Sequence, residues 1–72
     1  MAGPRTIMEL RKWRRKGVSG VIGFAYNDER GVYFDGEEFI LLAGTWAEDA
    51  TNWYVTGPLH SIYKLPKEEE QK

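Results

Sequence analysis

The 72-residue chain contains no cysteine. It can therefore form neither a disulfide nor a thiolate zinc site, and it offers no cysteine nucleophile. Long apolar runs are missing too, because none approaches the roughly 18 residues of a membrane span. The first residues lead into a charged segment rather than an export signal. We expect a cytoplasmic protein that does not act at a membrane.

Histidine is nearly absent. The single His60 stands beside Ser61, but neighbours on a strand point to opposite faces, whereas a base must lie within about 3 Å of the hydroxyl that it activates. A lone histidine is also a poor transition-metal site. The glycines of 17–23 lack the Lys-Ser/Thr and the following helix of a phosphate-binding loop. We predict no enzyme, no catalytic residue, no metal, no cofactor and no small-molecule substrate.

The net charge of -1 hides an asymmetry. Residues 1–16 carry six basic groups and one acid, a charge of +5, and the remaining residues carry four basic groups and ten acids, a charge of -6. The chain therefore has a cationic beginning and an anionic body.

Residues 7–16 have the pattern of a short helix. Thr6 and Glu9 have the spacing of a capping box, and Gly17 supplies a stop signal. Ile7, Leu10 and Trp13 would share an arc of about 120° in such a helix, opposite to most of the cations. Because ten residues alone make a marginal helix, we expect it to dock on the rest of the domain.

From residue 18 the apolar period changes to two, which indicates strands. The strands are expected at 18–26, 32–34, 37–43, 52–56 and 61–65, with a tight hairpin turn at Asp35-Gly36. The aromatic residues expected to face the core are Phe24, Phe34, Phe39 and Trp53.

These elements predict a mostly β member of the α+β class. The expected architecture is a small antiparallel sheet of about five strands, curved or closed like an SH3 barrel, with one N-terminal helix packed on it. The single domain covers residues 1–65, with the helix at 7–16 and a β-meander at 18–65. Residues 66–72 lack an apolar anchor, and we expect a disordered charged tail there.

Two surfaces are candidates for binding. Aromatic residues that the helix leaves uncovered would form a contact face, joined by an acidic loop between Trp46 and Trp53. The residues of this predicted partner site are Tyr33, Trp46, Glu48, Asp49, Tyr54 and Tyr63. The second candidate is the basic face of the helix, where cations around Trp13 could contact the phosphates and bases of DNA or RNA. Its residues are Arg11, Lys12, Arg14, Arg15 and Lys16.

Each surface also has a purely structural interpretation. The aromatic residues could simply form the core, and acids beside turns usually serve turn geometry and solubility. The cationic helix could be an ordinary solvated face, or it could pair with the acids of the body and leave no free patch.

Tyr33-x-x-Gly36, Trp46-x-Glu48 and the strand Trp53–Gly57 resemble a small uncharacterised β domain of Gram-positive bacteria, their plasmids and their integrative elements. The resemblance covers roughly residues 20–57. It departs at Ala43-Gly44, where that family often has Cys-Gly. It implies a cytoplasmic context connected with mobile elements, and no functional residue can be transferred from it.

The sequence therefore favours a non-enzymatic binding module that recognises a protein partner, or a second copy of itself, through the aromatic face and the Trp46–Trp53 segment. The alternative is a nucleic-acid accessory domain that uses the basic N-terminal residues.

Overall fold

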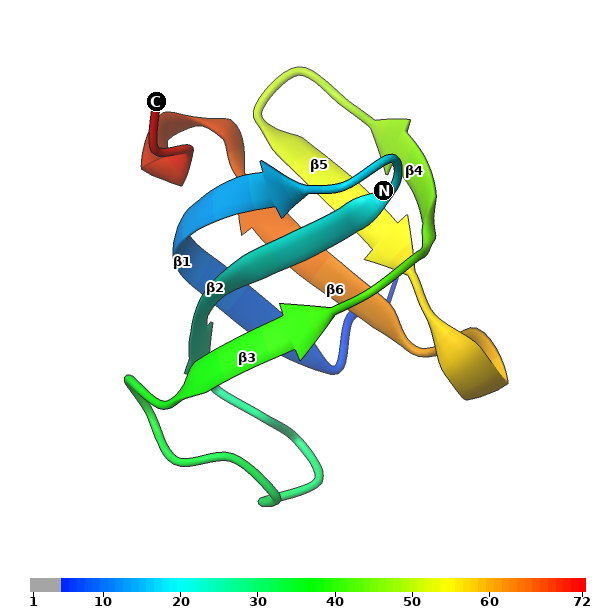
Figure 1. Cartoon of the computed structure of the whole chain (residues 1–72). Helices are drawn as coiled ribbons and strands as arrows, with labels where there is room; N and C mark the ends of the chain where they lie inside the picture. Colours follow the sequence, from blue (N-terminus) through cyan, green and yellow to red (C-terminus); the bar gives the residue numbers. More distant parts are fainter. Residues whose placement is uncertain (1–4) are drawn as a thin grey trace.

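A computed structural model describes residues 5–72 of the chain as one six-stranded mixed sheet (Figure 1). The sheet order is β3-β2-β1-β6-β5-β4, and all neighbouring strands are antiparallel except the parallel pair β1 and β6. The elements are β1 (Met8–Lys16), β2 (Gly20–Tyr26), β3 (Glu38–Leu41), β4 (Thr45–Glu48), β5 (Asn52–Thr56), the 3-10 turn η1 (Pro58–His60), β6 (Ile62–Pro66) and the 3-10 turn η2 (Lys67–Glu69).

The predicted helix at 7–16 is wrong, because these residues form strand β1. Met8 and Leu10 are buried at a spacing of two, as a strand requires, but the next buried residue, Trp13, comes three positions later. The β1–β2 register shifts between Arg11 and Arg14, and Lys12 has a φ of 49°. This irregularity is a β-bulge, which adds one residue to one strand. The bulge separates the buried residues Leu10 and Trp13 by three positions, which is the spacing that indicated a helix.

The rest of the predicted architecture is corrected in the same way. The mostly β character is confirmed, but the sheet is mixed rather than antiparallel, and no α-helix occurs in residues 5–72. Residues 32–34 are not a strand, so Asp35-Gly36 is part of a longer connection between β2 and β3 rather than the expected tight hairpin turn. Strand β4 overlaps the segment that was expected to be an acidic loop between Trp46 and Trp53. The sheet is not closed, because β3 and β4 are its two edges and no pairing joins them in the described part of the chain. None of the elements in residues 5–72 is a helix that could cross a membrane.

Trp13 occupies the centre of the core. Its side chain is 0% exposed, and its Nε1–H donates a hydrogen bond to the carbonyl oxygen of Pro66 at 2.8 Å. Gly23 on β2 lies directly against it, since a Cβ placed on this glycine would be 2.8 Å from the Cβ of Trp13. The inner face of β2 therefore consists of small residues, among them Val21 and Ala25, both 0% exposed.

Phe24 of β2 was expected to face the core, but it does not. This residue lies on the outer face and is 36% exposed, because Trp13 already fills the space under β2. Phe34, also expected inside, is 83% exposed, and Phe39 is buried as expected. Trp53 is half-buried and packs against the core.

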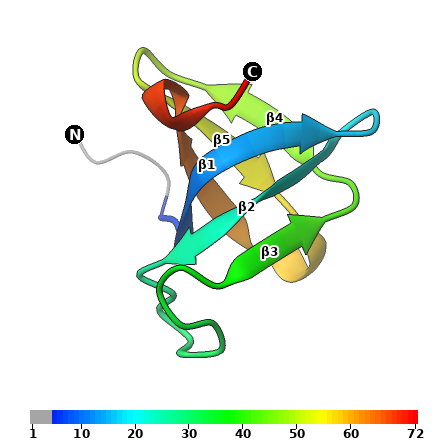
Figure 2. The same cartoon turned by 60° about the vertical axis from the view of Figure 1, so that its left-hand side comes forward.

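Residues 66–72 were expected to be a disordered tail, but Pro66 ends β6, residues 67–69 form η2, and the residues at its end contact β1 (Figure 2). The backbone N–H of Gln71 donates to the carbonyl oxygen of Trp13 at 2.7 Å, and Glu70 forms an isolated parallel bridge with the same tryptophan. The backbone N–H of Lys12 donates to a carboxylate oxygen of Glu69 at 3.1 Å. Strand β6 pairs with β1 only at Met8 and Glu9, and beyond that point the same side of β1 is left to pair with this polar segment.

We predict that Gly23→Ala destabilises the domain by more than Gly17→Ala. The added methyl group at 23 would overlap the Cβ of Trp13, whereas a Cβ at Gly17 meets nothing within 4 Å. Overpacking costs about 1–3 kcal/mol, and a non-glycine residue at positive φ costs roughly 1–2 kcal/mol. Urea unfolding of both variants measures the difference. A Gly23→Ala variant as stable as the wild type would contradict the close approach of Trp13 to β2.

Candidate functional site

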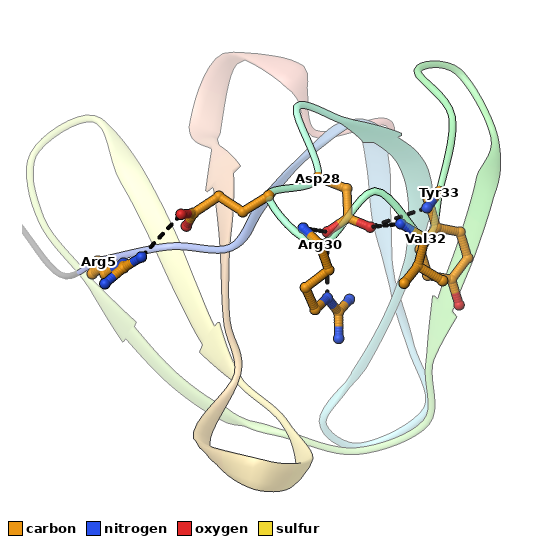
Figure 3. A network of polar contacts seen from close by, with 6 residues as sticks. Arg5, Asp28, Arg30, Val32 and Tyr33 are labelled. Atoms are coloured by element: carbon orange, nitrogen blue, oxygen red, sulfur yellow. Dashed lines mark hydrogen bonds and ion pairs between the residues drawn. The ribbon is translucent and has the colours of Figure 1, made fainter.

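The connection between β2 and β3, residues 27–37, is built around the carboxylate of Asp28 (Figure 3). One carboxylate oxygen accepts the backbone N–H groups of Val32 at 2.9 Å and Tyr33 at 3.0 Å. The other accepts the backbone N–H of Arg30 at 3.2 Å and its guanidinium Nε at 3.3 Å. The carboxylate is shielded from solvent. We call residues 27–37 the presenting loop.

Two further carboxylates fix the remainder of the presenting loop. Asp35 accepts the backbone N–H of Asn27 at 2.9 Å, which ties the two ends of the loop together. Glu37 accepts the backbone N–H of Phe34 at 3.0 Å. The backbone N–H of Gly36 donates to the carbonyl oxygen of Ala25 at 2.7 Å. Side chains of the loop accept five of its backbone N–H groups, and backbone carbonyls accept others, so the loop has a defined conformation without a partner.

The presenting loop directs one aromatic residue inward and two apolar residues outward. Tyr33 packs edge-on against Phe39, with ring centroids 5.1 Å apart, and this contact anchors the loop to the core. Val32 and Phe34, on either side of it, are 62% and 83% exposed. An ordered loop that holds apolar side chains in solvent is typical of a contact surface.

The outer face of β1, β2 and β3 adjoins the presenting loop. In the strand register, Phe24 lies between Arg11 and Glu38, and Ile22 lies between Arg14 and Ile40. We call the surface formed by these six residues the outer face. It mixes apolar groups with both signs of charge.

A hollow of about 350 Å³ lies at one end of the outer face. It is lined by Arg11, Lys12, Phe24, Tyr26, Gly36 and Glu69. The guanidinium of Arg11 lies 4.3 Å from the centre of the Tyr26 ring and is paired with Glu9 at 2.7 Å. Arg11, one of the two cations that line the hollow, is therefore already engaged with two groups of the same chain.

The predicted partner-site residues do not form one exposed face. Tyr63 is a core residue, 4% exposed, and its ring lies 5.0 Å from that of Phe39. Tyr33 belongs to the same cluster of rings. Trp46 belongs to a second cluster, with its ring centroid 6.0 Å from Trp13 and 5.6 Å from Trp53.

The acids of the Trp46–Trp53 segment have structural partners, because this segment is the β4–β5 hairpin rather than a free loop. Glu48 forms an ion pair with Lys67 at 2.6 Å. Asp49 accepts the backbone N–H groups of Thr51 at 2.9 Å and Asn52 at 2.8 Å, together with the hydroxyl of Tyr54 at 2.8 Å. Both acids, which were expected to belong to a contact surface, are therefore engaged in contacts within the domain.

The basic residues of 11–16 are divided rather than gathered. Arg11 and Arg14 lie on the outer face, whereas the guanidinium of Arg15 lies 4.2 Å from the ring centre of Trp46 and 4.8 Å from that of Trp53. Lys12 occupies the bulge, and Lys16 is the last residue of β1. Arg11 is paired with Glu9, and Arg15 lies 3.9 Å from Glu70. Of these two contacts, only that of Arg15 with Glu70 joins the basic segment to an acid of the body, the alternative that the sequence left open.

Nothing in residues 5–72 brings together three or more histidine, aspartate or glutamate side chains that could hold a metal ion.

The residues that the sequence analysis missed are Asp28, Val32 and Phe34. A signal for the first was present, since an acid at the start of a turn can accept several backbone N–H groups. Nothing in the sequence indicated that Phe34 would point outward.

Comparison of the chain with protein-family models, with curated proteins and with solved structures finds no match. The resemblance to the small β domain of Gram-positive bacteria and mobile elements therefore stays a prediction, and the function is argued from the structure alone.

The electrostatics of the presenting loop follow from its hydrogen bonds. Burial of the Asp28 carboxylate acts to raise its pKa, but the hydrogen bonds donated by Tyr33, Arg30 and Val32 outweigh it, so that the pKa lies below the usual value. The pKa of Asp49 is lowered as well, chiefly by the backbone N–H groups of Thr51 and Asn52. Both carboxylates therefore stabilise the fold in their charged form.

We predict that Asp28→Asn destabilises the domain at neutral pH by about 1–3 kcal/mol, because the amide NH₂ would face backbone N–H donors. A carboxylate with a lowered pKa contributes stability above its unfolded pKa of about 3.9, and that contribution is lost as the pH falls through the folded value. The difference between wild type and variant should therefore shrink below about pH 4.

Urea unfolding between pH 2 and pH 7 measures this difference. Glu29→Gln is the matched control, since it removes the same charge from a neighbouring residue whose side chain is half-exposed and paired only with the exposed Arg5. An Asp28→Asn variant as stable as the control at pH 7 would contradict the organising role of this carboxylate.

Proposed function

We propose that the protein is a non-enzymatic binding module that recognises a protein partner through Val32 and Phe34 of the presenting loop. The observation that carries the proposal is the combination of a backbone fixed by three carboxylates with a phenylalanine that is 83% exposed. We refer to these two apolar side chains as the loop anchor.

The energetics of association support a fixed loop as the contact element. Ordering a flexible segment on binding reduces affinity, and a pre-organised segment avoids most of that cost. Burial of one large apolar side chain contributes roughly 1.5–3 kcal/mol. The two side chains of the loop anchor, Phe34 and Val32, are exposed, while contacts of Asp28 and Tyr33 fix the backbone that carries them. Exposed aromatic anchors on rigid backbone are typical of binding hot spots.

The charge around the loop anchor favours a protein over a nucleic acid. Asp28, Glu29, Asp35 and Glu37 lie within the presenting loop, which contains one cation, Arg30. Acids repel phosphates, and binding of DNA or RNA depends on several cations that act together. The cations of β1 are shared between two faces and partly paired. We also propose a cytoplasmic location, which the absence of cysteine fits.

We predict that Phe34→Ser weakens partner binding at least about tenfold while stability changes by less than about 0.5 kcal/mol, because the side chain makes little contact with the fold. The matched control is Leu59→Ser, since Leu59 is 95% exposed on η1, a different part of the molecule (Figure 1). Affinity capture from cytoplasmic extract with quantitative mass spectrometry compares the wild type with both variants.

A protein retained by the wild type and by Leu59→Ser but lost by Phe34→Ser is the expected result. The same set of captured proteins for both variants would contradict the proposal. Salt-sensitive binding of single-stranded DNA or RNA by the wild type, abolished by alanine at Arg11 and Arg14, would favour the nucleic-acid alternative instead.

A further inference from the structure

Within residues 5–72, no strand pairs with the outer side of β3, an edge strand of the sheet. The backbone N–H of Ala25 donates to the carbonyl oxygen of Glu37 at 2.8 Å, and the β2–β3 register then continues without a shift. In an antiparallel ladder, alternate residues direct both backbone groups toward the neighbouring strand. Phe39 and Leu41 therefore face β2, whereas Glu38 and Ile40 direct their N–H and C=O groups away from it.

The side chains beside this free edge are apolar. Ile40 is 47% exposed and Leu42, just beyond the end of β3, is 77% exposed. Ile40 also lies next to Ile22 of β2 in the register, so that the edge continues an apolar row of the outer face. An uncovered edge with exposed apolar side chains is a template for pairing with another strand.

The other edge of the sheet, β4, is less suited to pairing. The tip of the β1–β2 hairpin lies against its start, where Ser19 accepts hydrogen bonds from the indole of Trp46 at 2.7 Å and from the backbone N–H of Gly44 at 3.4 Å. Trp46 packs inward against other tryptophans. The exposed residues of β4 are Thr45, Ala47 and Glu48, none of which is a large apolar side chain.

We propose that a second copy of this chain pairs with β3, antiparallel and centred on Ile40, so that one sheet continues across a symmetric dimer. In this register the N–H and C=O groups of Ile40 bond to those of Ile40 in the second copy. The only charged residue of β3, Glu38, then lies across from Leu42 of the second copy rather than from another Glu38. Self-pairing therefore satisfies the free backbone groups, places isoleucine against isoleucine and opposes no like charges.

The dimer uses the free edge of β3 and not the loop anchor, so it does not depend on the proposed function. Its contact is small, because one short strand from each copy supplies it. We expect a dissociation constant on the order of 10⁻⁴ M, at the weak end for protein interfaces.

Charge replacement at the two-fold axis tests the register directly. Ile40→Lys places two ammonium groups against each other, and Ile40→Glu places two carboxylates against each other. Either variant alone should raise the dissociation constant at least about tenfold, since like charges directly across a strand pair repel. An equimolar mixture of the two should recover dimers, and salt should weaken them, because position 40 then pairs opposite charges. Sedimentation velocity over a range of concentrations measures all three samples.

Two control variants locate the contact. Thr45→Lys places the same charge on the β4 edge, and Phe34→Ser removes the loop anchor; both should dimerise like the wild type. Circular dichroism and thermal unfolding confirm that each variant is folded.

Several results would overturn the proposed dimer. A wild type that stays monomeric at about 1 mM, ten times the expected dissociation constant, would do so and leave the proposed function to its own test. The proposal would also be overturned if Ile40→Lys dimerised as strongly as the wild type, or if the equimolar mixture of Ile40→Lys and Ile40→Glu stayed monomeric. A dimer lost in Phe34→Ser but kept in Ile40→Lys would transfer self-association to the loop anchor.

Discussion

The burial of Trp13 is the constraint on which the rest of the structure depends. Its indole is fully enclosed and donates to Pro66, and it can enter the core because a bulge at Lys12 turns it inward above Gly23. β1 is also the strand that joins β2 and β3 to β6, β5 and β4. Truncation of a buried tryptophan costs about 3–5 kcal/mol, which is comparable with the whole net stability that the core of a domain of this size supplies. Few other side chains of this chain carry a comparable share.

The same tryptophan explains why Phe24 of β2 is exposed on the surface. Because the indole fills the space under β2, the inner face of that strand accommodates only small residues, and Phe24 is left outside. Tyr33 and Phe39 complete the core at the base of the loop, and the three carboxylates hold the exposed part. Packing in the interior and presentation at the surface are therefore consequences of one arrangement.

Local patterns predicted most of β2, within the expected strand 18–26, and the strand at 52–56, because alternation is a short-range signal; within 27–37 they wrongly placed a strand at 32–34. They failed for β1, where a bulge between positions 10 and 13 gave the spacing of a helix and Thr6 with Glu9 resembled a capping box. The parallel pairing of β1 with β6, and the contact of the last residues with Trp13, depend on partners more than 50 positions away. Of the candidate site, the acids of the turn were recognisable from the sequence. The outward direction of Phe34 was not, because it follows from the packing of the neighbouring Tyr33 against Phe39.

The central claim is that residues 8–16 form a bulged strand that buries Trp13. Backbone ¹³C chemical shifts from NMR test it residue by residue, without a mutation. The account predicts extended values at Met8–Arg11 and again at Trp13–Arg15, interrupted at Lys12, together with an indole N–H of Trp13 that exchanges slowly with solvent. Continuous helical shifts from Ile7 to Lys16, or rapid exchange of that indole proton, would contradict it.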